Sequence, residues 1–311
     1  MSQILAAGHL NWDVTLRVAT LPDPDGEARI TEQHRAGGGS AANVASALAG
    51  FDLQAGLIGS VGSDPHGEMA IRELEAQGVD VSGVLTVEAG DTTVKYLVVD
   101  AAGEVMVLAN DGVNEAIGPA DVEPSMLAGA EHVHLTSQQP ETAGKLIDLA
   151  HESGLTVSFD PGRRVEERAF EPLLDAVDVL LLNERETTAV FDGASDEALS
   201  AAAGPDRTIV VKRGSDGASV YTESETVHHP GFEVEAVDTT GAGDAFAAGF
   251  LAATVGGLSP GFEGTVRATD VDYEQVVAIA NASGALAVQR PGARTAPTID
   301  ALAEFLAERT G

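Results

Sequence analysis

Short apolar runs alternate with helical stretches along most of the chain, and this pattern predicts βαβ units and a mostly parallel sheet. Apolar runs predict buried strands at residues 4–7, 56–58, 132–135, 156–159, 177–182 and 208–212. Between and after them, apolar residues recur at helical spacing, which predicts helices at residues 41–49, 67–76, 140–152, 242–255 and 273–288. The chain is therefore expected to fold as an α/β protein.

Two segments break this rhythm. Residues 14–18 and 28–35 alternate like a half-exposed antiparallel pair, and residues 92–99 and 105–109, joined by a turn at 100–103, predict a hairpin. Four such strands inserted into an α/β body predict a small second sheet beside it, for instance a lid. The Gly-rich, polar residues 256–270 predict a surface loop.

The charge balance is extreme. The 311 residues include 17 basic and 49 acidic side chains, with a formal net charge of -32 and only three lysines. At low ionic strength such a charge repels itself, whereas at ~1 M salt the Debye length falls to ~3 Å and the repulsion is screened. We interpret the composition as adaptation to a salt-rich cytoplasm; an ordinary acidic protein is the alternative.

Composition also narrows the choice of partners. The acidic balance disfavours nucleic acid and anionic membrane surfaces, both of which bind clustered Lys and Arg. The absence of cysteine excludes disulfides and thiolate chemistry. No apolar run approaches the ~18 residues of a membrane span. The first residues lack a basic region and reach Asp13 early, so no signal peptide is expected. We expect a cytoplasmic protein that acts on a small molecule.

The strongest chemical signal is the segment Asp238-Thr-Thr-Gly-Ala-Gly-Asp244, which opens a predicted helix. Gly241, Ala242 and Gly243 are small enough for backbone amides to approach an anion, and a helix start offers unpaired amides. Asp244 could accept a proton from an attacking hydroxyl. A turn followed by an ordinary helix-start acid explains the same residues, and spacing alone does not decide between the two.

The segment Asp-Thr-Thr-Gly-Ala-Gly-Asp-x-Phe at 238–246 resembles the C-terminal motif of the PfkB (ribokinase-like) carbohydrate kinases, and 37–43, Gly-Gly-Gly-Ser-Ala-Ala-Asn, resembles their N-terminal motif. Weaker matches at 183–186, 212–217 and 281–292 follow in the family order, so the resemblance covers essentially the whole chain. It implies one kinase domain over residues 1–311, a three-layer sandwich around a mostly parallel sheet, and a small β-sheet lid from about 13–36 and 91–111. Members often form homodimers through lid strands.

The resemblance also implies a reaction and roles. The family transfers the γ-phosphoryl group of ATP to a hydroxyl with Mg²⁺, so Asp244 would be the catalytic base, and the amides of Gly241, Ala242 and Gly243 the anion hole. Glu186 would hold magnesium through water. Nucleotide contacts would come from Asn183, Lys212, Gly214, Gly217 and Asn281. Some members are activated by potassium, and Asp238 and Thr240 lie in the corresponding loop, which makes a monovalent cation there a hypothesis.

On the sugar side, the resemblance implies contacts from Asn11, Asp13, Gly38, Gly39 and Asn43. A carboxylate such as Asp13 can accept two hydroxyl hydrogen bonds, which suits a vicinal diol. Arg164 would point at the phosphates or at an acidic group of the substrate. The adjacent Arg163 and Arg164 could instead bind a phosphate that the substrate already carries, because guanidinium suits bidentate oxyanion contacts. Surface pairing with Glu166 and Glu167 is the alternative for both arginines.

The acceptor stays open. Ribokinases carry a Lys where this chain has Ser40, and a Glu where it has Gln138 and Gln139, which puts ribose in doubt. The form of the N-terminal motif is similar to archaeal nucleoside kinases. Residues 160–164 are similar to fructokinases and 2-keto-3-deoxygluconate kinases, and a sugar phosphate is a further alternative.

Two other classes of function compete with a kinase. Residues 37–42 fit the G-x-G-x-x-A pattern of nicotinamide-dependent oxidoreductases, but the match is isolated and does not follow the first buried strand. A non-catalytic nucleotide or sugar sensor on the kinase fold is disfavoured, because every expected catalytic position is filled.

Overall fold

The computed structural model describes residues 4–309 apart from 103, 111, 260–270 and 296. Its larger sheet has the order β13-β12-β11-β10-β9-β8-β1-β4-β5. All neighbours from β11 to β5 pair in parallel, while β12 and β13 are antiparallel additions at one edge. The strands are β1 (Ile4–Ala7), β4 (Ala55–Gly62), β5 (Asp80–Val87), β8 (His132–Thr136), β9 (Thr156–Asp160), β10 (Val179–Asn183), β11 (Thr208–Lys212), β12 (Ala218–Tyr221) and β13 (Thr226–His229).

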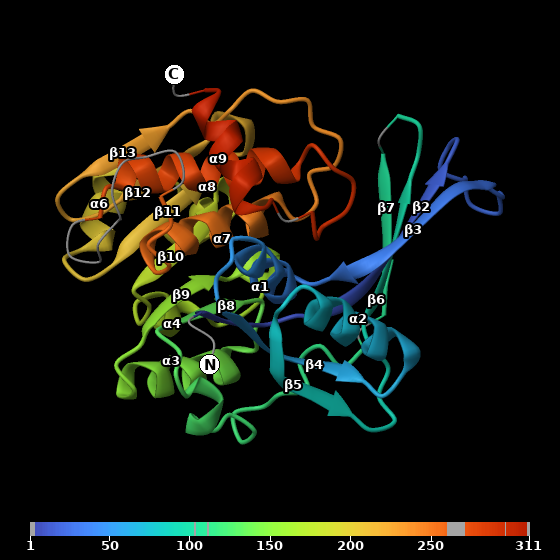
Figure 1. Cartoon of the computed structure of the whole chain (residues 1–311), viewed down its shortest axis with the longest axis horizontal. Helices are drawn as coiled ribbons and strands as arrows, with labels where there is room; N and C mark the ends of the chain where they lie inside the picture. Colours follow the sequence, from blue (N-terminus) through green and yellow to red (C-terminus); the bar gives the residue numbers. More distant parts are fainter. Residues whose placement is uncertain (1–3, 103, 111, 260–270, 296, 310–311) are drawn as a thin grey trace.

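Helices cover both faces of this sheet and give the predicted three layers (Figure 1). Because side chains alternate along a strand, Ile4 and Ala6 join one buried cluster, while Leu5 and Ala7 join the other. The first cluster packs against α1 (Ser40–Gly50), α2 (Pro65–Ala76), α7 (Ala242–Thr254), α8 (Tyr273–Ala287) and α9 (Ile299–Ala307). The second packs against α3 (Pro140–Glu152), α4 (Glu171–Leu174), α5 (Glu184–Phe191) and α6 (Asp196–Ala203).

The second sheet projects from the body beside α2 (Figure 1). It contains β3 (Ile30–Gly38), β2 (Asn11–Val18), β6 (Val94–Val99) and β7 (Val105–Ala109), in that order. The β2–β3 pair and the β6–β7 hairpin are antiparallel, as their alternation predicts, and β2 pairs with β6 in parallel. The prediction of a small second sheet is confirmed.

Several boundaries differ from the expectations. The strand expected at 56–58 continues through Gly62, because the Gly and Ser residues that follow are as buried as the apolar ones. Strands β5, β12 and β13 and helices α4, α5, α6 and α9 were not predicted. Every residue of β5 is half-exposed or exposed, and the strand contains a glycine, which weakens the signal of a buried strand. Most of the loop expected at 256–270 lies outside the described residues.

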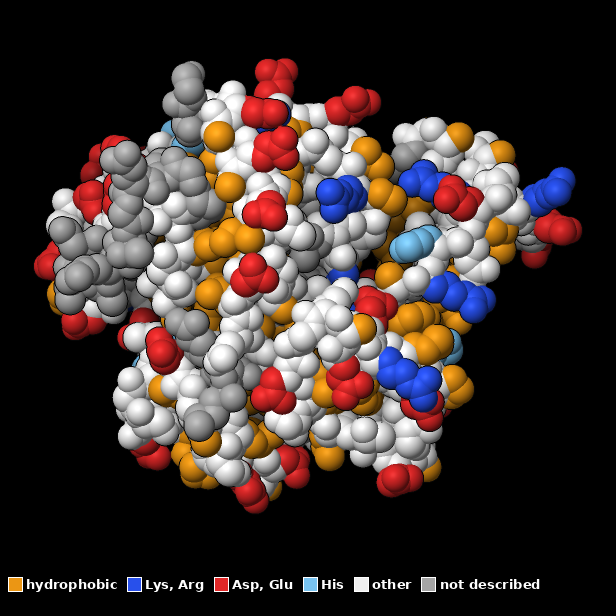
Figure 2. All heavy atoms as spheres, in the orientation of Figure 1, with side chains coloured by type: hydrophobic (Ala, Val, Ile, Leu, Met, Phe, Trp, Pro, Cys, Tyr) orange, Lys and Arg blue, Asp and Glu red, His pale blue; other side chains and the backbone are white. Residues whose placement is uncertain are grey.

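The topology brings the chemistry to one edge of the sheet. Parallel strands end on the same side, and open α/β sheets bind ligands beyond those carboxyl ends. On the face seen in Figure 2, acidic side chains are scattered widely, whereas Lys and Arg gather on the lid side. Within the described ranges, no helix is long and apolar enough to cross a bilayer.

Candidate active site

The two strongest motifs meet through a hydrogen bond between their polar side chains. Asn43 lies in the first turn of α1 and Asp244 in the first turn of α7, and these two helices pack against each other. The Asn43 Nδ2 atom donates to Asp244 Oδ2 at 2.7 Å. The fold therefore brings together two residues that are 201 positions apart in the sequence, and they form one polar centre.

Asp244 is placed to act as a proton acceptor. Burial raises the pKa of Asp244 to about 6, and the nearby charge of Asp160 adds to this rise. The hydrogen bond from Asn43 and the ammonium of Lys212 oppose it. The carboxylate is thus ionised at neutral pH, yet more basic than an exposed aspartate, as a general base requires.

The start of α7 presents backbone amides beside a positive charge. Gly241 has φ 77°, and a Cβ there would lie 2.3 Å from the Ala293 carbonyl oxygen, so only glycine fits. No described side chain caps α7. The Ala242 amide donates to the Thr239 carbonyl at 3.3 Å, so the expected contribution of Ala242 to an anion hole is spent in this conformation. The Lys212 ammonium lies next to the helix start, because a Cβ built at Gly243 would be 3.7 Å from Lys212 Nζ.

Glu186 and Asn183 are joined in a capping box at the start of α5. The Asn183 amide donates to Glu186 Oε2 and the Glu186 amide donates to Asn183 Oδ1, each at 2.9 Å. Glu186 is only 4% exposed, so it is not a solvated helix-start acid. Its pKa is raised by burial and by the charge of Asp160.

The charges around Glu186 fit a divalent cation. The Lys212 ammonium pairs with Asp160, and the negative charge of Asp244 also acts on it and raises its pKa. Three acidic side chains thus surround one lysine, and a cation would relieve their repulsion. In the described part of the chain, no three His, Asp or Glu side chains are grouped to ligate a metal alone. Magnesium would fit here through waters and phosphate oxygens, as is usual for this ion.

Asp13 lies against the Gly37–Gly38 backbone just before α1, and we call this part of the candidate site, with Asn11, Gly39 and Asn43, the sugar wall. A Cβ at Gly38 would lie 2.1 Å from Asp13 Oδ2, so glycine is required for the carboxylate to lie there. Asp13 Oδ1 is buried without a hydrogen-bond partner among the described residues. Burial raises the pKa of Asp13, while Lys95 and Arg294 oppose the rise.

Further polar atoms on this wall lack protein partners. In the ranges that the structure describes, Asn11 Nδ2 and Asn43 Oδ1 are buried without hydrogen bonds. The Asn114 Nδ2 atom donates to Asn11 Oδ1, which fixes the orientation of the Asn11 side chain. Gly39 has φ 97° and lies against the His9 carbonyl, so no side chain fits there. Buried polar atoms are rarely left unpaired, and these fit a ligand rich in hydroxyls.

Of the residues expected to contact the nucleotide, Gly214 and Gly217 lie in the β11–β12 turn, and Asn281 lies in α8. Gly214 and Gly217 have φ 60° and 79°, and a Cβ at Gly217 would lie 2.0 Å from the His229 carbonyl oxygen. The Asn281 Nδ2 atom lies 3.4 Å from His229 Nδ1 and donates to the Val277 carbonyl. Gly217, His229 and Asn281 therefore lie close together.

Asp238 connects two loops. Its Oδ1 accepts from the Thr240 amide at 2.9 Å and its Oδ2 from the Gly292 amide at 3.0 Å. Burial would raise the pKa of Asp238, but these hydrogen bonds lower it. Both carboxylate oxygens of Asp238 already accept hydrogen bonds from backbone amides, so Asp238 positions the two loops. A monovalent cation here would need further oxygen ligands.

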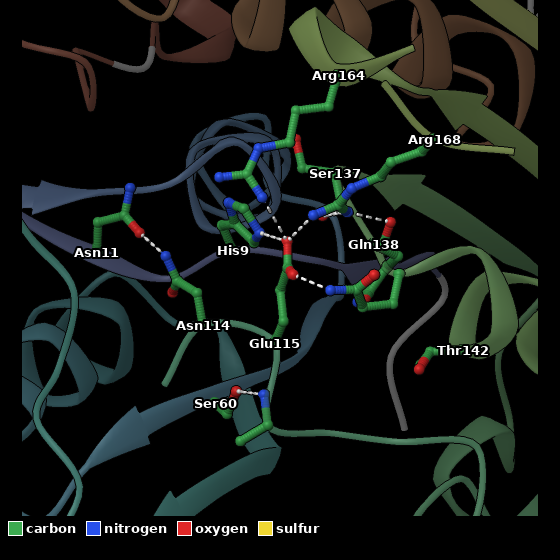
Figure 3. Close-up of polar contacts among 12 residues, drawn as sticks. His9, Asn11, Ser60, Asn114, Glu115, Ser137, Gln138, Thr142, Arg164 and Arg168 are labelled. Atoms are coloured by element: carbon green, nitrogen blue, oxygen red, sulfur yellow. Dashed lines mark hydrogen bonds and ion pairs between the residues drawn. The ribbon is translucent and has the colours of Figure 1, made fainter. Parts of the chain in front are cut away.

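Glu115 is a site residue that sequence reasoning missed. Arg164 does not pair with Glu166 or Glu167 but with Glu115 at 3.2 Å, while Glu166 pairs with Arg185. Figure 3 shows further donors around the same carboxylate. Glu115 lies in an irregular segment after β7, where no periodicity or motif could have identified it.

Arg294 was also missed. It is 2% exposed, pairs with Glu73 at 3.2 Å and donates to the Gly38 carbonyl at 2.9 Å. Glu73 in turn accepts from the Gly37 amide at 3.0 Å. This ion pair, buried on the Arg294 side, fixes the glycine backbone against which Asp13 lies.

Comparisons with known proteins agree with this geometry. The chain is 54% identical over 309 residues to an ATP-dependent ribose-1-phosphate kinase of Halopiger xanaduensis, covering 99% of each chain. The ribokinase structure of Thermotoga maritima superimposes with a TM-score of 0.83 at 24% identity, covering 98% of this chain and 99% of that one. The nucleoside kinase structure of Methanocaldococcus jannaschii gives 0.80 at 25% identity, covering 99% of both.

The family model described as "pfkB family carbohydrate kinase" matches residues 1–300. Together with the 54% identical relative, this match decides the class of the enzyme. The chain belongs to the pfkB family of carbohydrate kinases and is a kinase with the ribokinase fold.

Proposed function

We propose that this kinase transfers the γ-phosphoryl group of ATP, with Mg²⁺, to a hydroxyl of ribose 1-phosphate. The observation that carries the reaction is the Asn43–Asp244 pair at the start of α7, beside the Lys212 ammonium. The acceptor is proposed from the 54% identical relative, whose name states this substrate.

Asp244 accepts the proton of the attacking hydroxyl. Phosphoryl transfer needs little covalent chemistry from the protein, so positioning and charge neutralisation supply most of the catalysis. The backbone amides of Gly241 and Gly243 and the Lys212 ammonium face the charge that develops on the transferred group, and the Ala242 amide would join them once released from Thr239. Glu186 and Asn183 would hold magnesium through its waters, and the metal would supply positive charge to the phosphate oxygens.

Asp13 selects which hydroxyl reacts. Its unpartnered, buried carboxylate suits the vicinal 2- and 3-hydroxyls of ribose, which Asn11 and Asn43 can also contact. With this diol held and carbon 1 carrying a phosphate, the primary 5-hydroxyl is left for Asp244. The second sheet would close over the sugar and exclude water, which protects ATP from hydrolysis.

The other end of the site would hold the nucleotide. Gly214 and Gly217 line its loop, and Asn281 lies beside the adenine. We extend the proposal to potassium near Asp238 and Thr240, where the cation would steady the loop before α7. Equal rates in potassium, sodium and a bulky organic cation at matched ionic strength would refute this part.

We also propose a homodimer through the edge of the second sheet. All of β7 is exposed, including Val105 at 52%, Val107 at 54% and Leu108 at 55%. An apolar edge strand invites pairing, and a second copy would cover it. Light scattering should find a dimer that Val107→Asp converts to a monomer; an identical mass for both would refute the pairing.

The test of function is a coupled ADP-release assay with Mg-ATP in concentrated KCl. The panel contains ribose 1-phosphate, ribose, ribose 5-phosphate, fructose, fructose phosphates, 2-keto-3-deoxygluconate, adenosine, inosine and guanosine. We expect turnover with ribose 1-phosphate at a kcat/KM far above the others. Preference for a nucleoside would refute the proposed acceptor, and a silent panel from folded protein would favour a sensor.

A further inference from the structure

Four side chains from different parts of the chain converge on the carboxylate of Glu115 (Figure 3). Glu115 Oε1 contacts His9 Nε2 at 3.0 Å, Arg164 Nη1 at 3.2 Å and Arg168 Nη2 at 2.6 Å. Gln139 Nε2 donates to Oε2. We call these five residues the Glu115 cluster.

The charges of the Glu115 cluster do not cancel. Two guanidinium groups face one carboxylate, which leaves a positive surplus in a chain whose net charge is -32. Burial would raise the pKa of Glu115, but the hydrogen bonds from His9 and Arg168 lower it to about 2. The carboxylate is therefore ionised at neutral pH, and one positive charge still lacks a partner within the cluster.

The cluster borders the sugar wall of the site. His9 follows β1, and its carbonyl lies against Gly39 and accepts from the Ala42 amide, one residue before Asn43. On the other side, Asn114 directly precedes Glu115 and donates to Asn11. The surplus positive charge thus lies next to the atoms that fit the sugar hydroxyls.

The two arginines are held differently. Arg168 is 11% exposed and also donates to the Gln138 carbonyl at 2.7 Å, so its guanidinium is fixed. Arg164 is 50% exposed, and its recorded ion pair is the one with Glu115. One rigid and one adjustable guanidinium can accommodate an anion larger than a carboxylate.

We propose that His9, Arg164 and Arg168 bind the phosphate that the sugar substrate already carries, and that Glu115 keeps these donors together until it arrives. The inference rests on the proposed function and names the part of the site that recognises a sugar phosphate. A phosphate offers three oxygens to the same donors, and guanidinium groups bind such oxygens in pairs. The negative charge of the phosphate pairs with the positive charge that Glu115 leaves unpaired.

Arg164→Met tests the proposal, because it removes the charge and keeps the length of the side chain. Arg163→Met is the matched control, since Arg163 is also exposed, lies in the same short 3-10 turn and has no recorded contact with Glu115. We expect the KM for ribose 1-phosphate to rise about 10- to 100-fold in Arg164→Met only, as for the loss of a hydrogen bond to a charged group. The KM for ATP should stay within about twofold. Equal KM values in the two variants would overturn the assignment.

Calorimetry without ATP separates this inference from the proposed reaction. Ribose 1-phosphate, ribose and inorganic phosphate are titrated at one KCl concentration into wild type, Arg164→Met and Glu115→Gln. We expect ribose 1-phosphate to bind wild type and to weaken in Arg164→Met, while ribose binds both equally. If ribose 1-phosphate binds in this way but is not phosphorylated, the proposed reaction is refuted and the phosphate site is supported. If ribose 1-phosphate turns over and binds Arg164→Met as tightly, the site fails and the function stands.

Glu115→Gln distinguishes a phosphate site from a purely structural ion-pair group. Because the Glu115 charge competes with the phosphate, its removal should tighten binding of inorganic phosphate several-fold. A structural group would instead lose thermal stability with no gain in phosphate affinity, and that result would overturn the proposal.

Discussion

Removal of the Asn43 hydrogen bond should move the pH dependence of the reaction. Burial holds the pKa of Asp244 at about 6 even though Asn43 Nδ2 donates to its carboxylate at 2.7 Å. A hydrogen bond to a charged group contributes about 1.5–3 kcal/mol, and one pKa unit corresponds to about 1.4 kcal/mol. Leu has a similar volume to Asn and no donor. Replacement of Asn43 by Leu should therefore raise the pKa of Asp244, and with it the midpoint of the pH dependence of kcat/KM, from about 6 to about 7–8.

The sign follows from the role of a base. Asp244 must be ionised to accept a proton, so kcat/KM should rise with pH and level off above its pKa. In Asn43→Leu the curve should shift to higher pH. In Asn43→Ala the shift should be smaller, because water can enter and donate in place of the amide.

The assay is kcat/KM for the acceptor between about pH 5 and 9 at fixed KCl with saturating Mg-ATP. A substrate phosphate also titrates near pH 6, but identically for each enzyme, so the difference between variants isolates Asp244. Asn281→Leu is the control: this asparagine is also buried on a helix, at 8% exposed, but bonds to Val277 and His229. An unchanged midpoint in Asn43→Leu would refute Asp244 as the titrating base.

Three further predictions concern binding and stability. Gly38→Ala should raise the acceptor KM at least about tenfold with the fold retained, because the added Cβ would lie 2.1 Å from Asp13 Oδ2. The control Gly118→Ala should behave as wild type, because its Cβ would meet nothing closer than 3.6 Å. Burial lowers the pKa values of His132 and His134 to about 3, so the unfolded chain binds protons first as pH falls below 6.5. Urea unfolding at fixed KCl should therefore show a loss of about 2–4 kcal/mol between pH 7.5 and 5, and a free energy of unfolding unchanged over this range would contradict it. The melting temperature should rise as KCl increases from about 0.1 to about 1 M, where the Debye length falls from about 10 to about 3 Å; a flat response would refute salt adaptation.

The sequence predicted the parts of the fold that have a period. Strands that are buried on both faces appear in the sequence as apolar runs, and the β6–β7 hairpin appears as two segments of alternating apolar and polar residues joined by a turn. The Asn183-x-x-Glu186 pattern was interpreted through the family as a magnesium motif, yet the same spacing is that of a capping box, which α5 indeed begins with. Family motifs and local capping can therefore use the same residues.

Of the Glu115 cluster, the sequence predicted only Arg164 as an anion contact, and the rest could not be predicted for a physical reason. His9, Glu115 and Arg168 come from irregular segments and meet only when β1, β8 and β9 align in the sheet. Arg294 reaches the Gly37–Gly38 backbone across 256 residues, and no local pattern marks it. Such contacts depend on tertiary structure, whereas Asp244 and Asn43 were recognisable because their motifs are local.

The central claim is that Asp244 is the base of a kinase that acts on a sugar phosphate. The most direct measurement compares wild type and Asp244→Asn for ADP release with ribose 1-phosphate, together with calorimetric binding of ATP and of the sugar phosphate. We predict a loss of turnover of about 10²- to 10⁴-fold in Asp244→Asn with both ligands still bound. Turnover that survives the substitution, or an enzyme that phosphorylates ribose but not ribose 1-phosphate, would contradict the claim.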